Sequence, residues 1–360
     1  MLATTVAFAQ ANQSSVVQAG NSNGSTVLQV GNSNDSWVTQ DGLGALGNDN
    51  TADVDQNGFD NQSKVGQHGS DNIGYVDQVG DENDATIDQG VGNAEDNRAE
   101  TTQSGNDNTS LQKQRFDNNR AFVTQNGNDN KATQDQSSGP NGSLGNLATA
   151  IQTGNFNESI QKQTGNVNTA YARQIGDDNY ARQRQFGDNN TANADQGEND
   201  QHSDQYQYGN GNQAQVWQND ESIALGDNNK AYQTQIGDNN IATVDQGSPY
   251  GAFASSADNT ATQVQDGDRN NAYSMQNGDD NASTQKQYSN DNKSHHRQDG
   301  FENKATSNQD IVGSGTGDHE SWIYQTGTDN TATTNQTGFN HYSIVTQTGN
   351  MNTSTVTQSN

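Results

Sequence analysis

The chain has 360 residues, of which only 26% are hydrophobic, and a formal net charge of -28. Such a composition is typical of disordered proteins unless the order of the residues carries a pattern. The absence of Cys excludes disulfides and Cys-ligated metals, no apolar run is long enough for a transmembrane helix, and the acidic balance argues against nucleic acid as a partner.

The first eleven residues differ from the remainder of the chain. Residues 1–11 read MLATTVAFAQA, which is mildly apolar and uncharged, with small residues of the kind found where a secretory signal is cleaved. We interpret this segment as a signal-peptide remnant and expect the protein to be secreted, the alternative being a frayed N-terminus.

From residue 12 to residue 360 the sequence repeats with a period of eleven residues, in 29 repeats. We number each repeat from its leading residue, position zero, which is Asn except at Gln201, His319 and His341. Position two is always Ala, Ser or Gly, and position six is always Gln. The repeats that begin at residues 34, 83, 130, 212, 240 and 303 are longer, and their additional residues follow the Gln. We therefore predict loop extensions at the corners of one regular array.

Positions zero, two, four and six have the period of one face of a β-strand. None of these 116 positions holds Asp, Glu, Lys or Arg, so this face is predicted to be buried. A buried amide is costly unless it is hydrogen-bonded, and stacked identical amides can bond to one another as a ladder. The inward ladder residues are predicted to include Gln18, Gln29, Gln40, Gln56, Gln67, Gln78, Gln152, Gln163, Gln174, Gln185, Gln347, Gln358, Asn23, Asn168 and Asn179.

Alternate repeats differ at position four, which predicts two sheets. In the odd-numbered repeats from the ninth to the twenty-third this position is always Gln, whereas the even repeats between them carry Val, Ala or Ser. The Gln residues are Gln112, Gln134, Gln161, Gln183, Gln205, Gln233, Gln263 and Gln285. A large side chain on one sheet would face a small one on the other. We predict an all-β fold, a two-sheet parallel β-solenoid of about 14–15 coils with cross-β stacking at roughly 4.8 Å per coil.

The repeat resembles the curlin repeat of curli amyloid subunits. The resemblance rests on the order Ser14, Gln18, Gly20, Asn23, Ser25, Gln29, which returns later as Ala170, Gln174, Gly176, Asn179, Ala181, Gln185. It implies a structural subunit that forms extracellular fibres with copies of itself, in biofilm matrix and cell adhesion. It also implies a nucleator and an outer-membrane secretion pore as partners. Familiar curlins carry an export-targeting segment before the repeats, whereas here the repeats begin at Asn12, so the export route stays open.

No enzyme, cofactor or metal site is predicted. The six His residues are scattered, and the inward face has no carboxylate that could act as an acid or a base. His319 and His341 replace Asn one coil apart, where they either share a metal or simply substitute in the ladder, and two ligands are too few for a structural metal site. Weak binding of divalent cations to surface acids is expected. The alternative function is that of a non-polymerising secreted solenoid, acting as a surface adhesin or an ice-binding-type rod.

Overall fold

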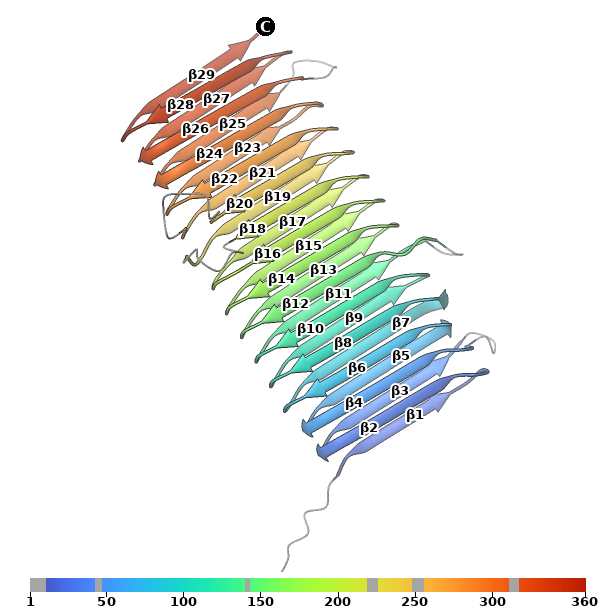
Figure 1. Ribbon diagram of the computed structural model, residues 1–360. Coiled ribbons are helices and arrows are strands. Elements are labelled where there is room, and N and C mark those ends of the chain that lie inside the picture. Colours follow the sequence, from blue (N-terminus) through green and yellow to red (C-terminus); the bar gives the residue numbers. More distant parts are fainter. Residues whose placement is uncertain (1–10, 43–46, 140–142, 219–225, 248–255, 311–316) are drawn as a thin grey trace, which may run out of the picture. The chain divides into compact units, whose positions relative to one another are not determined.

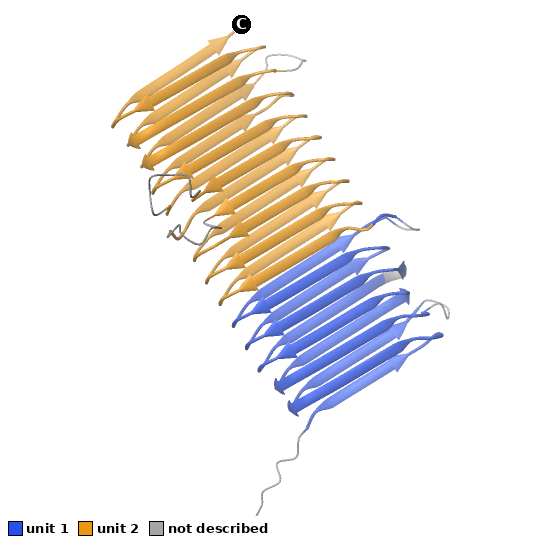
Figure 2. Ribbon diagram, viewed as in Figure 1, with its two compact units in different colours: residues 1–144 blue, residues 145–360 orange. Residues whose placement is uncertain are grey.

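The computed structural model describes residues 11–42, 47–139, 143–218, 226–247, 256–310 and 317–360. The predicted signal remnant, except for residue 11, and much of five of the six predicted extensions lie outside these residues. The chain divides into two compact units, residues 1–144 and residues 145–360 (Figure 2). The described ranges contain strands and turns without any helix, and hence no helix suited to crossing a membrane.

Unit 1 contains two parallel sheets. Its strands are β1 (Gln13–Gln18), β2 (Gly24–Asn32), β3 (Asp35–Asp41), β4 (Thr51–Phe59), β5 (Gln62–Ser70), β6 (Ile73–Val79), β7 (Asp84–Glu95), β8 (Arg98–Ser104), β9 (Thr109–Arg115), β10 (Arg120–Asn126) and β11 (Lys131–Ser137). The odd-numbered strands follow one another in one sheet and the even-numbered strands in the other (Figure 1).

Unit 2 repeats this arrangement of odd and even strands in separate sheets. Its strands are β12 (Leu147–Thr153), β13 (Glu158–Thr164), β14 (Thr169–Ile175), β15 (Tyr180–Phe186), β16 (Thr191–Gln196), β17 (His202–Tyr208), β18 (Gln213–Gln218), β19 (Lys230–Ile236), β20 (Ile241–Gln246), β21 (Thr260–Asp266), β22 (Asn271–Asn277), β23 (Ala282–Gln287), β24 (Lys293–Phe301), β25 (Lys304–Asp310), β26 (Glu320–Thr328), β27 (Thr331–Thr337), β28 (Tyr342–Thr348) and β29 (Thr353–Ser359).

The register of the strands follows the repeat and not the number of intervening residues. Gln67 pairs with Gln89, and Gln205 pairs with Gln233 even though the repeat between them is extended. Parallel pairing of equal repeat positions puts identical side chains at equal heights. The predicted fold class, all-β with two parallel sheets of the β-solenoid type, is confirmed in each unit.

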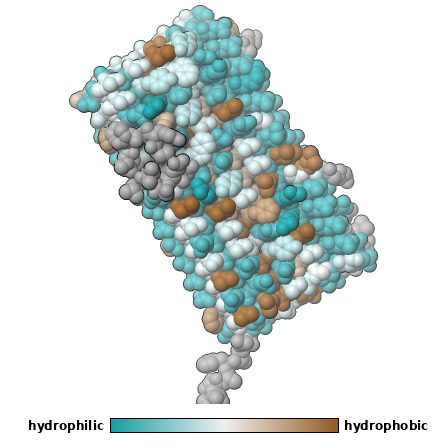
Figure 3. All heavy atoms as spheres, viewed as in Figure 1, coloured by the Kyte–Doolittle hydropathy of each residue, from teal (hydrophilic) through white to brown (hydrophobic). Residues whose placement is uncertain are grey.

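Burial alternates along each strand, because successive side chains point to opposite faces. On β14, Ala170, Ala172 and Gln174 are buried, whereas the outward residues between them are partly exposed. Three residues at positions three and five, Gly66, Thr243 and Met275, are nevertheless buried. The visible outer surface is mostly hydrophilic with scattered apolar patches (Figure 3).

The corners depend on close approach of the backbone between coils as well as on turn geometry. Gly31 has a φ of +113°, and a Cβ atom there would lie 1.9 Å from the carbonyl oxygen of Gly58 in the next coil of its sheet. In most repeats the residue before position zero also has a positive φ, and it is often not Gly or Asn, as at Val167 (58°) and Met351 (55°). These corners therefore hold bulkier residues in the left-handed region than the preference for Gly and Asn predicts.

The extended repeat that begins at Asn83 differs from the loop predicted for it. Strand β7 continues to Glu95, and its register with β5 shifts between Gln67 and Gly69. The additional residues form a β-bulge, which inserts chain length while pairing resumes beyond it.

Candidate functional site

The most uniform feature of the interior is a ladder of Gln side chains at position six. Each Gln donates from Nε2 to the Oε1 atom of the Gln one coil further along the chain, as in Gln67 to Gln89 (2.9 Å) and Gln174 to Gln196 (3.0 Å). The same Nε2 group of Gln67 also donates to the backbone oxygens of Thr51 (2.9 Å) and Asn72 (3.0 Å). The ladder therefore satisfies buried amides and binds the turn and the opposite sheet at once.

A second Gln ladder occupies position four of the odd strands, on β9 and β11 in unit 1 and from β13 to β23 in unit 2. Gln161 donates to Gln183 at 2.9 Å, and Gln183 donates to Gln205 at 2.9 Å. Each also donates across the core to the backbone of the even sheet, as Gln183 does to Tyr171 at 2.8 Å. The facing residues Ala172 and Ala194 are small and buried, so a long amide can reach across.

The Asn ladder at position zero runs in the opposite direction. Asn190 donates from its backbone nitrogen (3.0 Å) and from Nδ2 (3.1 Å) to Oδ1 of Asn168, which belongs to the preceding coil. Asn168 in turn donates to the carbonyl oxygen of Gly187 at 2.7 Å. The Asn side chain therefore closes each corner, while the Gln side chains connect the strands.

Each predicted Gln lies at an inward position of its strand, and each predicted Asn lies directly before the first residue of a strand. Within unit 1 the bonds join Gln18 to Gln40, Gln29 to Gln56, Gln40 to Gln67, Gln56 to Gln78, and Gln112 to Gln134 at 2.7–3.1 Å, and Asn23 accepts from Asn50. Gln78 continues to Gln103. Within unit 2 they join Gln152 to Gln174, Gln163 to Gln185, Gln325 to Gln347 and Gln336 to Gln358 at 2.9 Å. Asn179 donates to the backbone carbonyl oxygen of Glu198 and accepts from the backbone nitrogen of Gln201.

Four of these residues are not buried as an inward position predicts. Gln18 is exposed, and Asn23, Gln29 and Gln358 are partly exposed. They lie in the outermost described coils, whose strands pair with a neighbouring strand on one side only. The loss of burial is not uniform there, because Gln347 on β28, which also pairs with a strand on one side only, stays buried.

His319 and His341 continue the Asn ladder. Their rings stack with centroids 5.2 Å apart, the backbone nitrogen of His341 donates to Nδ1 of His319 (3.2 Å), and Nε2 of His319 lies 2.9 Å from the carbonyl oxygen of Asp310. Nδ1 thus takes the place of Asn Oδ1, and Nε2 takes the place of Nδ2. Among the described residues, no group of three or more His, Asp or Glu side chains is arranged to hold a metal ion.

His296 is an interior residue that the sequence reasoning did not single out. It lies at position four of β24, fully buried, with Nδ1 2.9 Å from Ser283 Oγ and Nε2 2.6 Å from Ser307 Oγ. Burial lowers the pKa of His296 to about 3, with a smaller contribution from His295. One feature of the sequence could have indicated this residue. The series of Gln residues at position four of the odd strands ends at Gln285, and the next odd strand carries the smaller Ser307, which leaves room for an imidazole.

Charged side chains occupy the outer faces, where register brings both opposite and like charges together. Arg173 forms two bonds of 2.7 Å with Asp195 of the neighbouring strand. Asp55 is instead paired in register with Asp77, and the pKa of Asp77 is raised by burial and then by Asp55. The outer surface of unit 1 thus holds unneutralised acids in adjacent coils.

Together, the sheets and the ladders define a parallel β-solenoid in which each coil repeats the hydrogen bonds of the one before. The sequence model of a family described as curlin associated repeat matches residues 47–90 and 327–359. The chain therefore contains curlin repeats in both compact units, and the predicted resemblance is confirmed in these two regions. No curated protein matches the chain. Both the curlin repeat family and the all-β repeat fold are associated with structural roles and not with catalysis.

The ladder can be tested by comparing two adjacent residues of β19. Replacement of inward Gln235 by Leu removes its bonds to Gln207 and Gln265, each 2.9 Å. We expect Gln235→Leu to lower the free energy of unfolding by about 1–3 kcal/mol for each amide left unpaired. The outward Thr234→Leu, which introduces the same residue next to it, should have little effect in urea unfolding. Equal destabilisation by the two variants would contradict the ladder assignment.

The buried His296 predicts a specific loss of stability in acid. The imidazole of His296 takes up a proton near pH 6.5 in the unfolded chain but only near pH 3 in the folded chain. The stability that the neutral, buried imidazole contributes is therefore complete above pH 6.5 and is lost as the pH falls towards 3. Between pH 7 and pH 4.5 we expect the native chain to lose about 2–3 kcal/mol more than His296→Asn. Urea unfolding of both chains at both pH values measures the difference, and an identical pH dependence would show that His296 does not titrate on unfolding.

Proposed function

We propose that this chain is a structural subunit of extracellular, curli-like amyloid fibres, which it builds with other copies of itself. One observation carries the proposal: within each unit, identical side chains are hydrogen-bonded from coil to coil in a parallel, in-register stack. This is the arrangement of a cross-β fibre inside a single chain. A coil that bonds to its neighbour through side chains identical to its own has the same complementarity to a coil of another copy.

The outermost described strands support another copy of the chain as the binding partner. Within the described residues β1, β2, β28 and β29 have a pairing strand on one side only. Their inward side chains are of the same kinds, namely Ser14, Val16, Gln18, Ser25, Val27 and Gln29 on β1 and β2, and Ser343, Val345, Gln347, Ser354, Val356 and Gln358 on β28 and β29. Open strand edges template further pairing, and matching rows of Ser, Val and Gln would continue the core between copies.

The wider setting of the proposal comes from the curlin repeats. They support secretion through an outer-membrane pore, assembly started by a nucleator, and a role in biofilm matrix and cell adhesion. Surface acids such as Asp55 and Asp77 would bind divalent cations weakly. The ladders supply hydrogen bonds along the stack, and we assign them a structural role and no catalytic one.

Assembly is expected to be fibrous and seeded. The purified chain should form fibres that give a reflection at about 4.8 Å along the fibre axis and grow without a lag when seeded. Val356→Lys places a charge on the inner face of β29, and we expect it to slow seeded growth strongly. Thr355→Lys, on the outer face of the same strand, is the control. A native chain that stays monomeric for days in the presence of seeds would favour the non-polymerising adhesin or ice-binding rod.

Charge repulsion is expected to set the lag time. At a net charge of -28, acidification towards pH 4, added salt and millimolar divalent cations should each shorten the lag, because they protonate, screen or bridge the carboxylates. The double variant Asp55→Asn, Asp77→Asn should shorten it too. A matched control is Asp195→Asn, Asp291→Asn, which removes the same charge from carboxylates already paired with Arg173 and Arg269. Thioflavin fluorescence measures the lag, and a lag that salt lengthens would contradict the proposal.

A further inference from the structure

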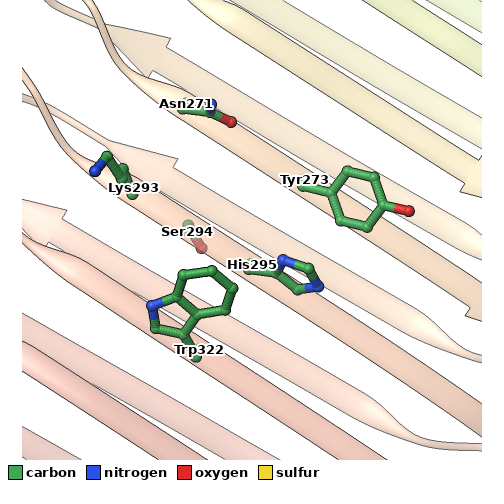
Figure 4. A pocket seen from close by; sticks show the side chains of 6 residues that line it. All are labelled: Asn271, Tyr273, Lys293, Ser294, His295 and Trp322. Carbon is green, nitrogen blue, oxygen red and sulfur yellow. The ribbon is translucent and has the colours of Figure 1, made fainter.

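A hollow of about 280 Å³ lies on the outer face of the even sheet of unit 2. It is lined by Asn271 and Tyr273 from β22, Lys293, Ser294 and His295 from β24, and Trp322 from β26 (Figure 4). Its volume is just below the lower limit of typical ligand-binding cavities, which run from about 300 Å³ upward. The hollow therefore has room for a small ring and not for a protein segment.

Aromatic rings form a continuous strip along the hollow. The ring centroids of Tyr273 and His295 are 4.7 Å apart, those of His295 and Trp322 are 4.8 Å apart, and Figure 4 shows His295 between the other two rings. Register causes this, since all three residues hold position three of successive even strands. Burial lowers the pKa of His295, and Arg297 lowers it further, so the strip is uncharged at neutral pH.

The polar groups around the strip include both hydrogen-bond donors and acceptors. The indole nitrogen of Trp322 is buried and has no hydrogen-bond partner among the described residues. A buried donor without an acceptor is uncommon and calls for an explanation. At the rim, Nζ of Lys293 lies 3.1 Å from Oε1 of Glu320, and Asn271 is exposed, so ammonium, carboxylate and amide groups surround one apolar surface.

We propose that this hollow binds one ring of a neutral extracellular polysaccharide. A pyranose ring has an apolar face of C–H groups, whose partial positive charge suits the negative face of an aromatic ring. Its hydroxyl groups would bond to Asn271 and to the Lys293–Glu320 pair. Acidic sugars are disfavoured because the chain carries a net charge of -28 and Lys293 is already paired with Glu320. This site goes beyond the proposed function and does not require a fibre.

The direct test follows the emission of Trp322 in the full chain. The variant Trp37→Phe, Trp217→Phe leaves Trp322 as the one Trp of the sequence. Titration with cellotetraose and with mannotetraose should change its emission saturably for at least one of the two, and tetragalacturonate should bind more weakly. Absence of a saturable change with both neutral sugars, or stronger binding of tetragalacturonate, would overturn the proposal.

Calorimetry on alanine variants locates the site. Trp322→Ala and Tyr273→Ala should each weaken the binding of the responding tetrasaccharide about tenfold, the size expected for the loss of one ring contact. The matched control is Trp37→Ala, because Trp37 is exposed and also holds position three, but Ser15 and Lys64 flank it in place of rings. Equal weakening in Trp37→Ala would overturn the assignment, and the emission experiment decides if an alanine variant does not fold.

Discussion

The structure depends on one constraint, that an amide removed from water must keep its hydrogen bonds. Gln and Asn fill the interior of both units, and most of them meet this requirement by bonding to a counterpart one coil away and to nearby backbone carbonyls, as Gln67 does; the buried Nδ2 group of Asn270 is an exception. A ladder of this kind tolerates no shift of register, because a one-residue slip would turn the amides outwards. The uniform Gln at position six is therefore a consequence of bonding between coils and not of the needs of any single strand.

The same constraint shapes the width of the core. Where position four of the odd sheet is Gln, the facing residues of the even sheet are small, and the amide crosses to the opposite backbone, as from Gln183 to Tyr171. Where it is Val or Ile, as at Val65 and Ile87, apolar packing replaces the bond. His296 with its Ser partners is a third solution, in which hydroxyl groups satisfy an imidazole. All three fill a narrow space between sheets without leaving an amide unpaired.

The inward and outward side chains of the strands can therefore have different functions. The inward positions maintain the stack and offer the same surface to a further coil, which is the basis of the proposed assembly. The outward positions do not form the ladders, so they can hold acids that repel one another, such as Asp55 and Asp77, or aromatic rings such as those that line the hollow at Trp322. Charge on the outer face does not disturb the ladders, because successive side chains of a strand point to opposite faces of the sheet.

The sequence by itself determined the strands, the two sheets, the parallel register and the inward face, since each follows from a period of two within a period of eleven. It also identified the ladder residues, of which Gln174 is an example. Only the tertiary structure decided that the Asn and Gln ladders run in opposite directions, that the residues after Gln89 form a bulge in β7, and that Tyr273, His295 and Trp322 enclose a hollow. Periodicity specifies which positions are neighbours, whereas these features depend on the directions that individual side chains take and on which of several acceptors each donor meets.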